Sequence, residues 1–234
     1  MHTARQAPEW CAGLPGVEDV DAVLAQNSVI YGQTLRIVRT QDGIPIEMPS
    51  AGKGGKHDLE SIYRAYAEGW TLVFNGLHHR SAEVAQLAAQ LGDVLAHDVG
   101  VNLYVTPPNA QGFAPYMDGH DVFIPQTSGS KEWRVYRPAV DLPEQDVNID
   151  PVDVGPCLVQ ATLEPGHVLC IPRGFVHEGV SASGTSLHLT FGIHSLRWID
   201  AVKDTVQLAA ERSVQFRRSV PMQSLSPGQF HRTL

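Results

Sequence analysis

The stretch "SLHLTFGIH", residues 186–194, alternates between apolar and polar side chains along its whole length. Successive side chains of a β-strand point to opposite faces of the sheet, so the alternation predicts a strand with two unlike faces. The apolar face carries Leu187, Leu189, Phe191 and Ile193. The opposite face carries Ser186, His188, Thr190, Gly192 and His194. A face lined by histidine and threonine indicates a strand that looks into a cavity rather than simply out to water.

Short strand-like segments separated by turns precede this stretch. The sequence marks the turns with "TPPN", "TSGS" and "EPG". Many short strands at this spacing are typical of a β-sandwich or a small barrel. The strand-like segments are residues 101–106, 121–126, 132–137, 157–163 and 167–172.

The first hundred residues mix helices with strands. A Gly/Pro/Lys-rich segment, residues 44–58, is predicted to be a loop. Asp58 and Ser81 are each placed to cap a helix, and Gly69 to end the first of the two. Further elements are predicted as a helix over residues 17–26 and strands over residues 33–40 and 70–76.

A helical segment, residues 196–216, follows the last strand. Its apolar side chains recur every three or four residues, which is the spacing of one helix face. This stripe consists of Trp198, Ile199, Val202, Val206 and Ala210. An apolar stripe requires a partner, and we expect either the N-terminal helices or a second copy of the chain.

Composition excludes several classes of function. The 234 residues are 43% hydrophobic and 18% charged, which is an ordinary globular balance. A formal net charge of -8 without a run of Lys or Arg argues against a nucleic-acid partner. No apolar run is long enough to span a membrane, and the N-terminus has no signal-peptide pattern. Three scattered cysteines form neither a disulfide framework nor a thiolate metal site, so we expect a cytoplasmic protein.

Side chains that can bind a metal lie in two stretches. "QGFAPYMDGHDVF", residues 111–123, offers Tyr116, Asp118 and His120 at alternating positions, which one strand would place on one face. "LEPGHVLCIPRGFVHEG", residues 163–179, delivers His177 at the rim of a strand. One carboxylate and two imidazoles form the facial triad of non-haem Fe(II) oxygenases, although Mn, Co, Ni and Zn accept the same donors. The alternative is structural: Asp118 makes a turn or ion pair, and His177 is a hydrogen-bonded barrel histidine.

These motifs together resemble a known family. Residues 102–138, 163–177 and 186–190 are similar to the JmjC-type 2-oxoglutarate oxygenases, in their ribosomal-oxygenase, or cupin-like, branch of protein hydroxylases. The resemblance implies a mostly β fold with flanking helices, the double-stranded β-helix or jelly roll. It also implies Fe(II), 2-oxoglutarate, and hydroxylation of an unactivated C–H bond in a peptide, protein or amino-acid-derived substrate. We accordingly expect an oxygenase domain over residues 1–194 and a helical dimerisation extension over residues 195–234, in a homodimer.

The resemblance also assigns roles to particular residues. Asp118 and His177 fall on metal-ligand positions, and Lys131 in "GSKEW" falls on the lysine that binds 2-oxoglutarate. A buried ammonium suits the distal carboxylate of that cosubstrate, whereas a solvated lysine at a hairpin end is the alternative. The remaining positions that match the cosubstrate pocket are Asn102, Tyr104 and His188.

One position departs from the family pattern, which is His-x-Asp. Tyr116 stands where the first histidine belongs, and three interpretations follow. His120 supplies the third ligand, although on one strand it starts about 6.5 Å from Asp118. Alternatively, Tyr116 binds as a phenolate, for which the metal must displace a proton of pKa about 10. Otherwise the metal site is degraded and the chain is a catalytically silent peptide-binding pseudoenzyme.

Overall fold

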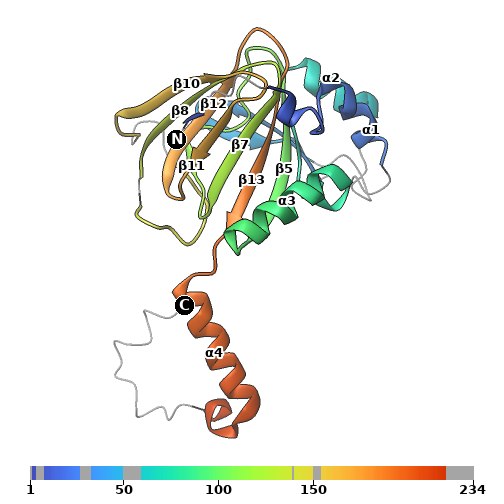
Figure 1. The fold of residues 1–234 in the computed structure, drawn as a ribbon. Coiled ribbons are helices and arrows are strands. Elements are labelled where there is room, and N and C mark those ends of the chain that lie inside the picture. Colours follow the sequence, from blue (N-terminus) through green and yellow to red (C-terminus); the bar gives the residue numbers. More distant parts are fainter. Residues whose placement is uncertain are drawn as a thin grey trace. The chain divides into compact units, whose positions relative to one another are not determined.

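The structure is a computed structural model that describes residues 2–3, 8–26, 33–49, 59–138, 140–149 and 154–219. The chain divides into two compact units, residues 1–195 and residues 196–234. The first unit contains two antiparallel β-sheets that face each other, with helices beside the larger one (Figure 1). This is the predicted double-stranded β-helix with flanking helices.

The larger sheet has eight strands in the order β1-β11-β7-β13-β5-β4-β2-β3. Its strands are β1 (His2–Thr3), β2 (Leu35–Gln41), β3 (Ile44–Glu47), β4 (Thr71–Phe74), β5 (Asp98–Thr106), β7 (Asp121–Ser128), β11 (Val168–Ile171) and β13 (Ser186–His194). The smaller sheet has five strands in the order β10-β8-β12-β6-β9. These are β6 (Tyr116–Met117), β8 (Lys131–Pro138), β9 (Val147–Asn148), β10 (Cys157–Leu163) and β12 (Phe175–Ser181).

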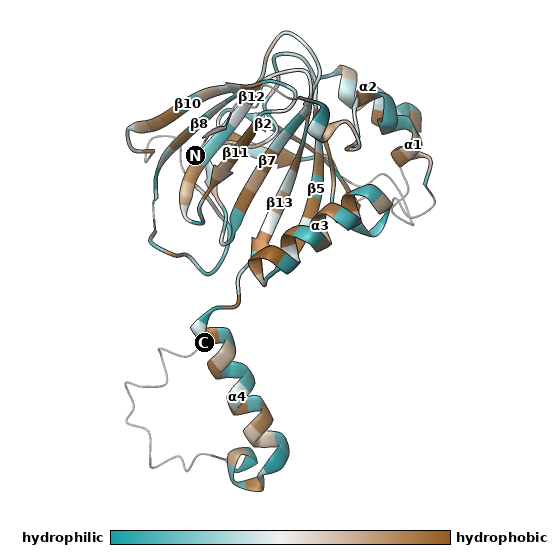
Figure 2. Ribbon diagram, viewed as in Figure 1, coloured by the Kyte–Doolittle hydropathy of each residue, from teal (hydrophilic) through white to brown (hydrophobic). Residues whose placement is uncertain are grey.

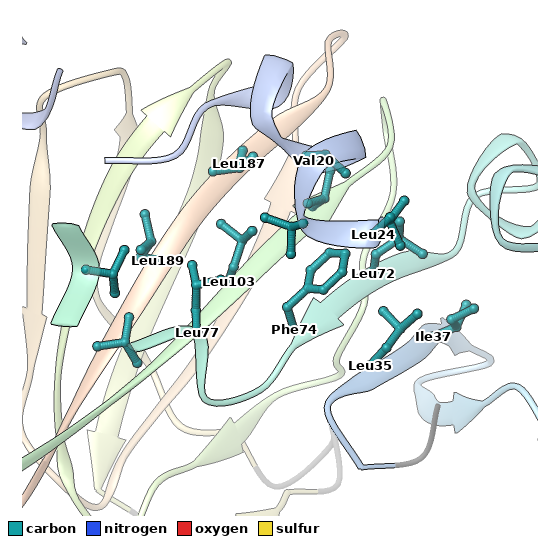
Figure 3. Packing of buried hydrophobic residues seen from close by; sticks show 14 of the residues in the cluster. Val20, Leu24, Leu35, Ile37, Leu72, Phe74, Leu77, Leu103, Leu187 and Leu189 are labelled. Atoms are coloured by element: carbon teal, nitrogen blue, oxygen red, sulfur yellow. The ribbon is translucent and has the colours of Figure 1, made fainter. Parts of the chain in front are cut away.

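Helices contribute to the hydrophobic core on one side of the larger sheet (Figure 3). The helical elements of this unit are α1 (Val20–Leu24), α2 (Leu59–Ala67), α3 (Ala82–Leu95) and the 3-10 turns η1 (Pro8–Cys11), η2 (Val17–Asp19) and η3 (Leu77–His79). The backbone N–H of Val84 donates to the Ser81 hydroxyl at 3.3 Å, so Ser81 caps α3 as predicted. The predicted cap at Asp58 lies outside the described residues.

Strand β13 separates this helix-side core from the space between the sheets. Its residues Leu187, Leu189 and Phe191 belong to the helix-side cluster, with Leu103 of β5. A second cluster combines side chains of both sheets, including Ile124 of the larger sheet and others of the smaller one. The polar side chains of β13 therefore face the interior of the β-helix, as the alternation predicts.

The prediction of a loop over residues 44–58 is wrong at its start. Residues 44–47 form β3, which pairs with β2 across a tight turn at Asp42 and Gly43, whose φ values are 51° and 76°. Two successive positive φ values are the geometry of a hairpin turn that matches the twist of its strands. Pro45 is tolerated because β3 is the edge strand of its sheet. Residues 50–58 are not among the described residues.

The expected single strand through Tyr116, Asp118 and His120 is also wrong. Strand β6 ends at Met117 in the smaller sheet and β7 begins at Asp121 in the larger one. Residues 118–120, the crossover bend, carry the chain from one sheet to the other. A Cβ atom at Gly119 would lie 3.0 Å from backbone atoms of Gln145, so only glycine allows this close approach without displacement. The directions of the side chains at residues 118–120 therefore cannot be predicted from strand alternation.

The second unit contains α4 (Trp198–Arg212), followed by the 3-10 turn η5 (Val214–Arg217). The side chain of Asp200 accepts hydrogen bonds from the Arg197 backbone N–H at 3.2 Å and from its guanidinium at 2.7 and 2.9 Å. Apolar and polar residues alternate along α4 (Figure 2), and none of its residues is buried. Among the described helices, none combines the length and the apolar character that a membrane span requires.

Gly129 offers a test of the strand connections, because its φ is +61° and a Cβ there would collide with the carbonyl of Thr185. We expect Gly129→Ala to lower the free energy of unfolding by about 1–3 kcal/mol, since the left-handed backbone strain and the collision act together. Gly184→Ala is the matched control, because no atom lies within 4 Å of a Cβ at that position. Urea unfolding of both variants measures the difference, and equal midpoints would contradict the assigned turn.

Candidate metal centre and cosubstrate pocket

Asp118 and His177 lie side by side although 58 residues separate them in the sequence. His177 is on β12, and its Nε2 is 3.4 Å from Oδ2 of Asp118 in the crossover bend. Adjacent ligand atoms of a six-coordinate metal ion with bonds of about 2.1 Å lie about 3 Å apart. The two side chains therefore fit neighbouring positions around one ion.

The imidazole of His177 is oriented for metal binding. Its Nδ1 lies 3.0 Å from the carbonyl oxygen of Phe175, which can only accept, so Nδ1 donates there and the neutral tautomer keeps its lone pair on Nε2. Nε2 is buried, and none of the described residues gives it a hydrogen bond. Buried polar atoms usually have partners, and metal-binding histidines usually donate their other N–H to a carbonyl or carboxylate. Within the described residues, His177 thus hydrogen-bonds through Nδ1, and Nε2 is available to a ligand.

Tyr116 lies directly beside this pair. Its residue on β6 is opposite His177 on β12, and the two rings are 4.3 Å apart between centroids. Burial, with the nearby charge of Asp118, raises the pKa of the Tyr116 phenol well above its usual value. The neutral phenol is therefore favoured in the protein without a metal.

His120 and Asp146 complete a group around Asp118. One ligand atom from each of these three side chains lies within 4.8 Å of the other two. His120 Nδ1 is 3.6 Å from Asp146 Oδ1, which also accepts a hydrogen bond of 2.7 Å from the Gly119 backbone N–H. The sequence did not single out Asp146, because it lies in an irregular segment and reaches the site only through the fold.

The charges of this group act on His120. Burial disfavours its imidazolium, but the carboxylates of Asp146 and Asp118 outweigh burial and raise the pKa of His120. The interaction with His120 in turn lowers the pKa of Asp146. The His120 ring lies 4.7 Å from the His194 ring, between centroids, and a Cβ on Gly192 would be 2.6 Å from His120 Nε2. The absence of a side chain at Gly192 thus makes room for this imidazole.

Lys131 is buried in the interior, with 5% of its surface exposed. Its Nζ donates to the Thr106 hydroxyl at 3.3 Å and lies 5.2 Å from the centre of the Trp133 ring. Within the part of the chain that the structure describes, no carboxylate forms an ion pair with it, and burial lowers its pKa to about 7. The alternative of a solvated hairpin-end lysine does not hold. A buried ammonium without a counter-charge instead suits an anionic ligand. Thr106, its hydroxyl partner, was not predicted.

His188 is close enough to Lys131 to be affected by its charge, and Tyr104 stacks on His188. Their rings stack almost in parallel, 4.8 Å apart between centroids, and His188 meets Trp133 edge to face at 5.3 Å. Burial, reinforced by the Lys131 charge, holds the pKa of His188 well below its usual value, so its imidazole is neutral. Its Nδ1 is buried without a hydrogen-bond partner. Two of the predicted pocket residues thus lie together with the predicted lysine.

A cavity of about 450 Å³ opens beside the metal-ligand candidates. This volume is within the usual range of small-molecule sites. Asn102, also in the lining, accepts a hydrogen bond of 2.9 Å from the Gly76 backbone N–H. The other lining residues discussed above are Tyr104, Tyr116, Asp118, His120, Asp146, Gly192 and His194. Lys131, His177 and His188 are buried and do not belong to this lining.

Comparison with known proteins identifies the family. The JmjC domain family matches residues 77–200, just over half of the chain. The chain belongs to the JmjC domain family. Human ribosomal oxygenase 1 is 35% identical over 93% of this chain and 35% of its own length. The Drosophila persimilis bifunctional lysine-specific demethylase and histidyl-hydroxylase NO66 is 27% identical over 87% of this chain and 30% of its length.

This JmjC chain therefore spans about a third of the length of these curated relatives. Among solved structures, Escherichia coli ribosomal oxygenase YcfD in complex with cobalt and 2-oxoglutarate matches with a TM-score of 0.61. That match has 19% sequence identity and covers 91% of this chain and 53% of YcfD. At this identity the likeness shows the shared fold.

Lys131 predicts a pH dependence of stability. Its pKa is about 7 in the folded protein and about 10.5 in the unfolded chain, so between these values only the unfolded state binds the proton. Stability contributed by this residue therefore rises with pH from about 7 to about 10.5 and is lowest below 7. We expect Lys131→Met to raise the free energy of unfolding at pH 6, on the order of a few kcal/mol, and to flatten this rise.

Urea unfolding at pH 6 to 9 measures this effect, with Lys203→Met, at an exposed position of α4, as control. An unchanged slope in Lys131→Met would contradict the buried, unpaired ammonium.

Proposed function

We propose that this chain is an Fe(II)- and 2-oxoglutarate-dependent dioxygenase that hydroxylates an unactivated C–H bond. The observation that carries the proposal is the buried His177 Nε2, which has no hydrogen-bond partner and lies 3.4 Å from the Asp118 carboxylate. Lys131 adds a buried cation without a counter-charge in the same β-helix. Membership of the JmjC family, with relatives named as oxygenases, supports this function.

One set of residues is proposed to bind the metal and another to bind the cosubstrate. Asp118 and His177 hold the metal, His120 is the proposed third ligand, and Tyr116 is the alternative. When bound, Fe(II) supplies the oxygen activation that protein side chains cannot perform. Lys131 pairs with the distal carboxylate of 2-oxoglutarate through a charge-assisted hydrogen bond.

The residues around Lys131 and at the neighbouring cavity orient the cosubstrate. Neutral His188 has a buried Nδ1 available for a hydrogen bond, and its stack with Tyr104 forms an aromatic wall. Asn102 lies at the cavity edge, where its amide is held by the Gly76 N–H. Low polarity around Lys131 strengthens its attraction for a carboxylate.

The proposed substrate is a side chain of a protein or peptide, with an amino-acid-derived compound as the smaller alternative. Ribosomal proteins are the first candidates, because the relatives at 35% and 27% identity are named ribosomal oxygenase and histidyl-hydroxylase. We place the protein in the cytoplasm, on the composition described above. A nucleic-acid partner is not proposed.

A second candidate function is supported by Tyr116. Because Tyr116 stands at the family's first histidine position, the metal site lacks the neutral imidazole that this histidine supplies. The alternative function is therefore that of a peptide-binding pseudoenzyme with the JmjC fold. Binding of a peptide in the cavity without turnover of 2-oxoglutarate distinguishes this function from the oxygenase.

The oxygenase proposal is tested with protein purified without oxygen. We expect stoichiometric Fe(II) binding, lost in both Asp118→Ala and His177→Ala because too few donors remain, and succinate formation from 2-oxoglutarate. Lys131→Ala should weaken 2-oxoglutarate binding about 10–100-fold, and Lys131→Arg should restore it only in part. Iron retained by both alanine variants would refute the metal site, and iron-free protein that still binds peptide would favour the pseudoenzyme.

We also propose that the chain is a homodimer that covers the apolar stripe of α4. Trp198 is 89% exposed, and Val202 and Val206 are about half exposed, at 55% and 51%. An aspartate at Val202 or Val206 should convert dimers to monomers, because a charge cannot be buried in an apolar interface without a partner. Light scattering at several concentrations measures this, with Asp204→Asn, at an exposed position on the opposite face of α4, as control. A monomeric unmodified chain would refute the dimer.

A further inference from the structure

Asp146 lies at the metal centre, although neither a sequence motif nor the family pattern points to it. We propose that Asp146 is a metal ligand, which joins Asp118, His177 and His120 to give two carboxylates and two imidazoles. It adds a fourth protein donor at a centre where Tyr116 stands in place of the family's first histidine, and so compensates for that loss. This inference rests on the proposed metal-dependent function and specifies the ligands of the same site.

The position of Asp146 is fixed by backbone contacts. Its Oδ1 accepts a 2.7 Å hydrogen bond from the Gly119 N–H, in the middle of the crossover bend. Immediately after it, Val147 on β9 pairs with Met117 on β6, directly before the bend. Close contact of Gly119 with the Gln145 backbone brings the two segments within van der Waals distance. Asp146 is therefore held against the bend that carries Asp118 and His120.

The donor atoms are close enough to share an ion. Among the described residues, one group of at least three His, Cys, Asp or Glu side chains has all ligand atoms within 4.8 Å, and it consists of Asp118, His120 and Asp146. Opposite ligand atoms of a six-coordinate ion with bonds of about 2.1 Å lie about 4.2 Å apart. A movement of about half an ångström closes these three donors around one ion, whereas His177 is outside this group and reaches the site through its 3.4 Å approach to Asp118.

His177 provides an independent observation that an ion belongs here. Its Nε2 is buried at 1% side-chain exposure, has no hydrogen-bond partner, and lies 3.4 Å from Asp118 Oδ2. An ion bound to Asp118 supplies the partner that this nitrogen lacks. Asp118 thus connects the buried donor on β12 with the more exposed donors His120 and Asp146.

The chemistry of a second carboxylate suits the ion. Two carboxylates balance the charge of a divalent cation, and their hard oxygen atoms suit Fe(II) and Mn(II). Asp146 has 63% of its side chain exposed, so it can adjust to the ion without repacking a core. The alternative is that Asp146 only clamps the bend through the Gly119 N–H.

Asp146→Asn separates a ligand from a clamp. Asparagine keeps the shape and the acceptor oxygen for Gly119 but removes the charge that binds a cation. The probe is Mn(II) added to the full chain, with free Mn(II) measured by its electron paramagnetic resonance signal. We expect Asp146→Asn to weaken binding about 100-fold or more, which exceeds the usual effect of a residue that merely orients a ligand. Asp141→Asn, an exposed carboxylate of the same segment, should bind like the unmodified chain.

The Tyr116→His background gives a second measurement. If Asp146 replaces the missing histidine, restoring that histidine should reduce the effect of Asp146→Asn to less than about 10-fold, as a double-mutant cycle shows. Thermal unfolding confirms that each variant is folded.

Three results would overturn the assignment. Mn(II) affinity unchanged in Asp146→Asn, with loss in Asp118→Asn and His177→Ala, refutes Asp146 as a ligand and leaves the proposed function intact. If Asp146→Ala loses Mn(II) affinity while Asp146→Asn keeps it, Asp146 only holds the crossover bend through the Gly119 N–H and is not a ligand. Absence of binding by the unmodified chain refutes the metal-dependent function and this inference together.

Discussion

Buried polar atoms without partners constrain the interior of this β-helix. Among the residues that the structure describes, His177 Nε2, His188 Nδ1 and Trp133 Nε1 are buried without hydrogen-bond partners, and Lys131 has no counter-charge. Each such group costs free energy in the protein alone. The cost is offset by the apolar core on the helix side of the larger sheet, to which α1, α2 and α3 all contribute. Ligands that supply the missing partners therefore stabilise the fold as they bind.

Small residues matter as much as the polar ones at this site. A Cβ on Gly179 would lie 2.8 Å from Lys131 Cε, and one on Gly192 would lie 2.6 Å from His120 Nε2. Glycine in a strand weakens the strand but allows another group to approach closely. Both glycines lie on strands of the β-helix, and each leaves space for a side chain of the candidate site, Lys131 or His120. At these two positions the strands carry no side chain, and the space is occupied by the Lys131 ammonium stem and the His120 imidazole.

Much of this arrangement can be predicted from local sequence. The alternation over residues 186–194 specifies both faces of β13, because strand geometry depends only on neighbouring residues. The family motifs indicate Asp118, His177 and Lys131, which the structure places in one β-helix. Asp146 could not be predicted, because no periodic pattern or motif includes it and only tertiary contacts, through β9 and Gly119, bring it to the site. The prediction of one strand through Tyr116, Asp118 and His120 failed for a related reason, because tertiary contacts at the crossover bend override strand alternation.

The crossover bend also shows how the donors of the proposed metal centre can differ from the family pattern while the fold is kept. Tyr116 is fixed in register opposite His177, so the sheet dictates where that side chain lies. The chain leaves the smaller sheet at Met117, and the next three residues are free of ladder hydrogen bonds until β7 begins at Asp121. The bend is held instead by single hydrogen bonds, from the Gly174 N–H to the Asp118 carbonyl at 2.9 Å and from the Gly119 N–H to Asp146 at 2.7 Å. Strand register therefore fixes the buried half of the site, and contacts outside the two ladders fix the half that the bend contributes.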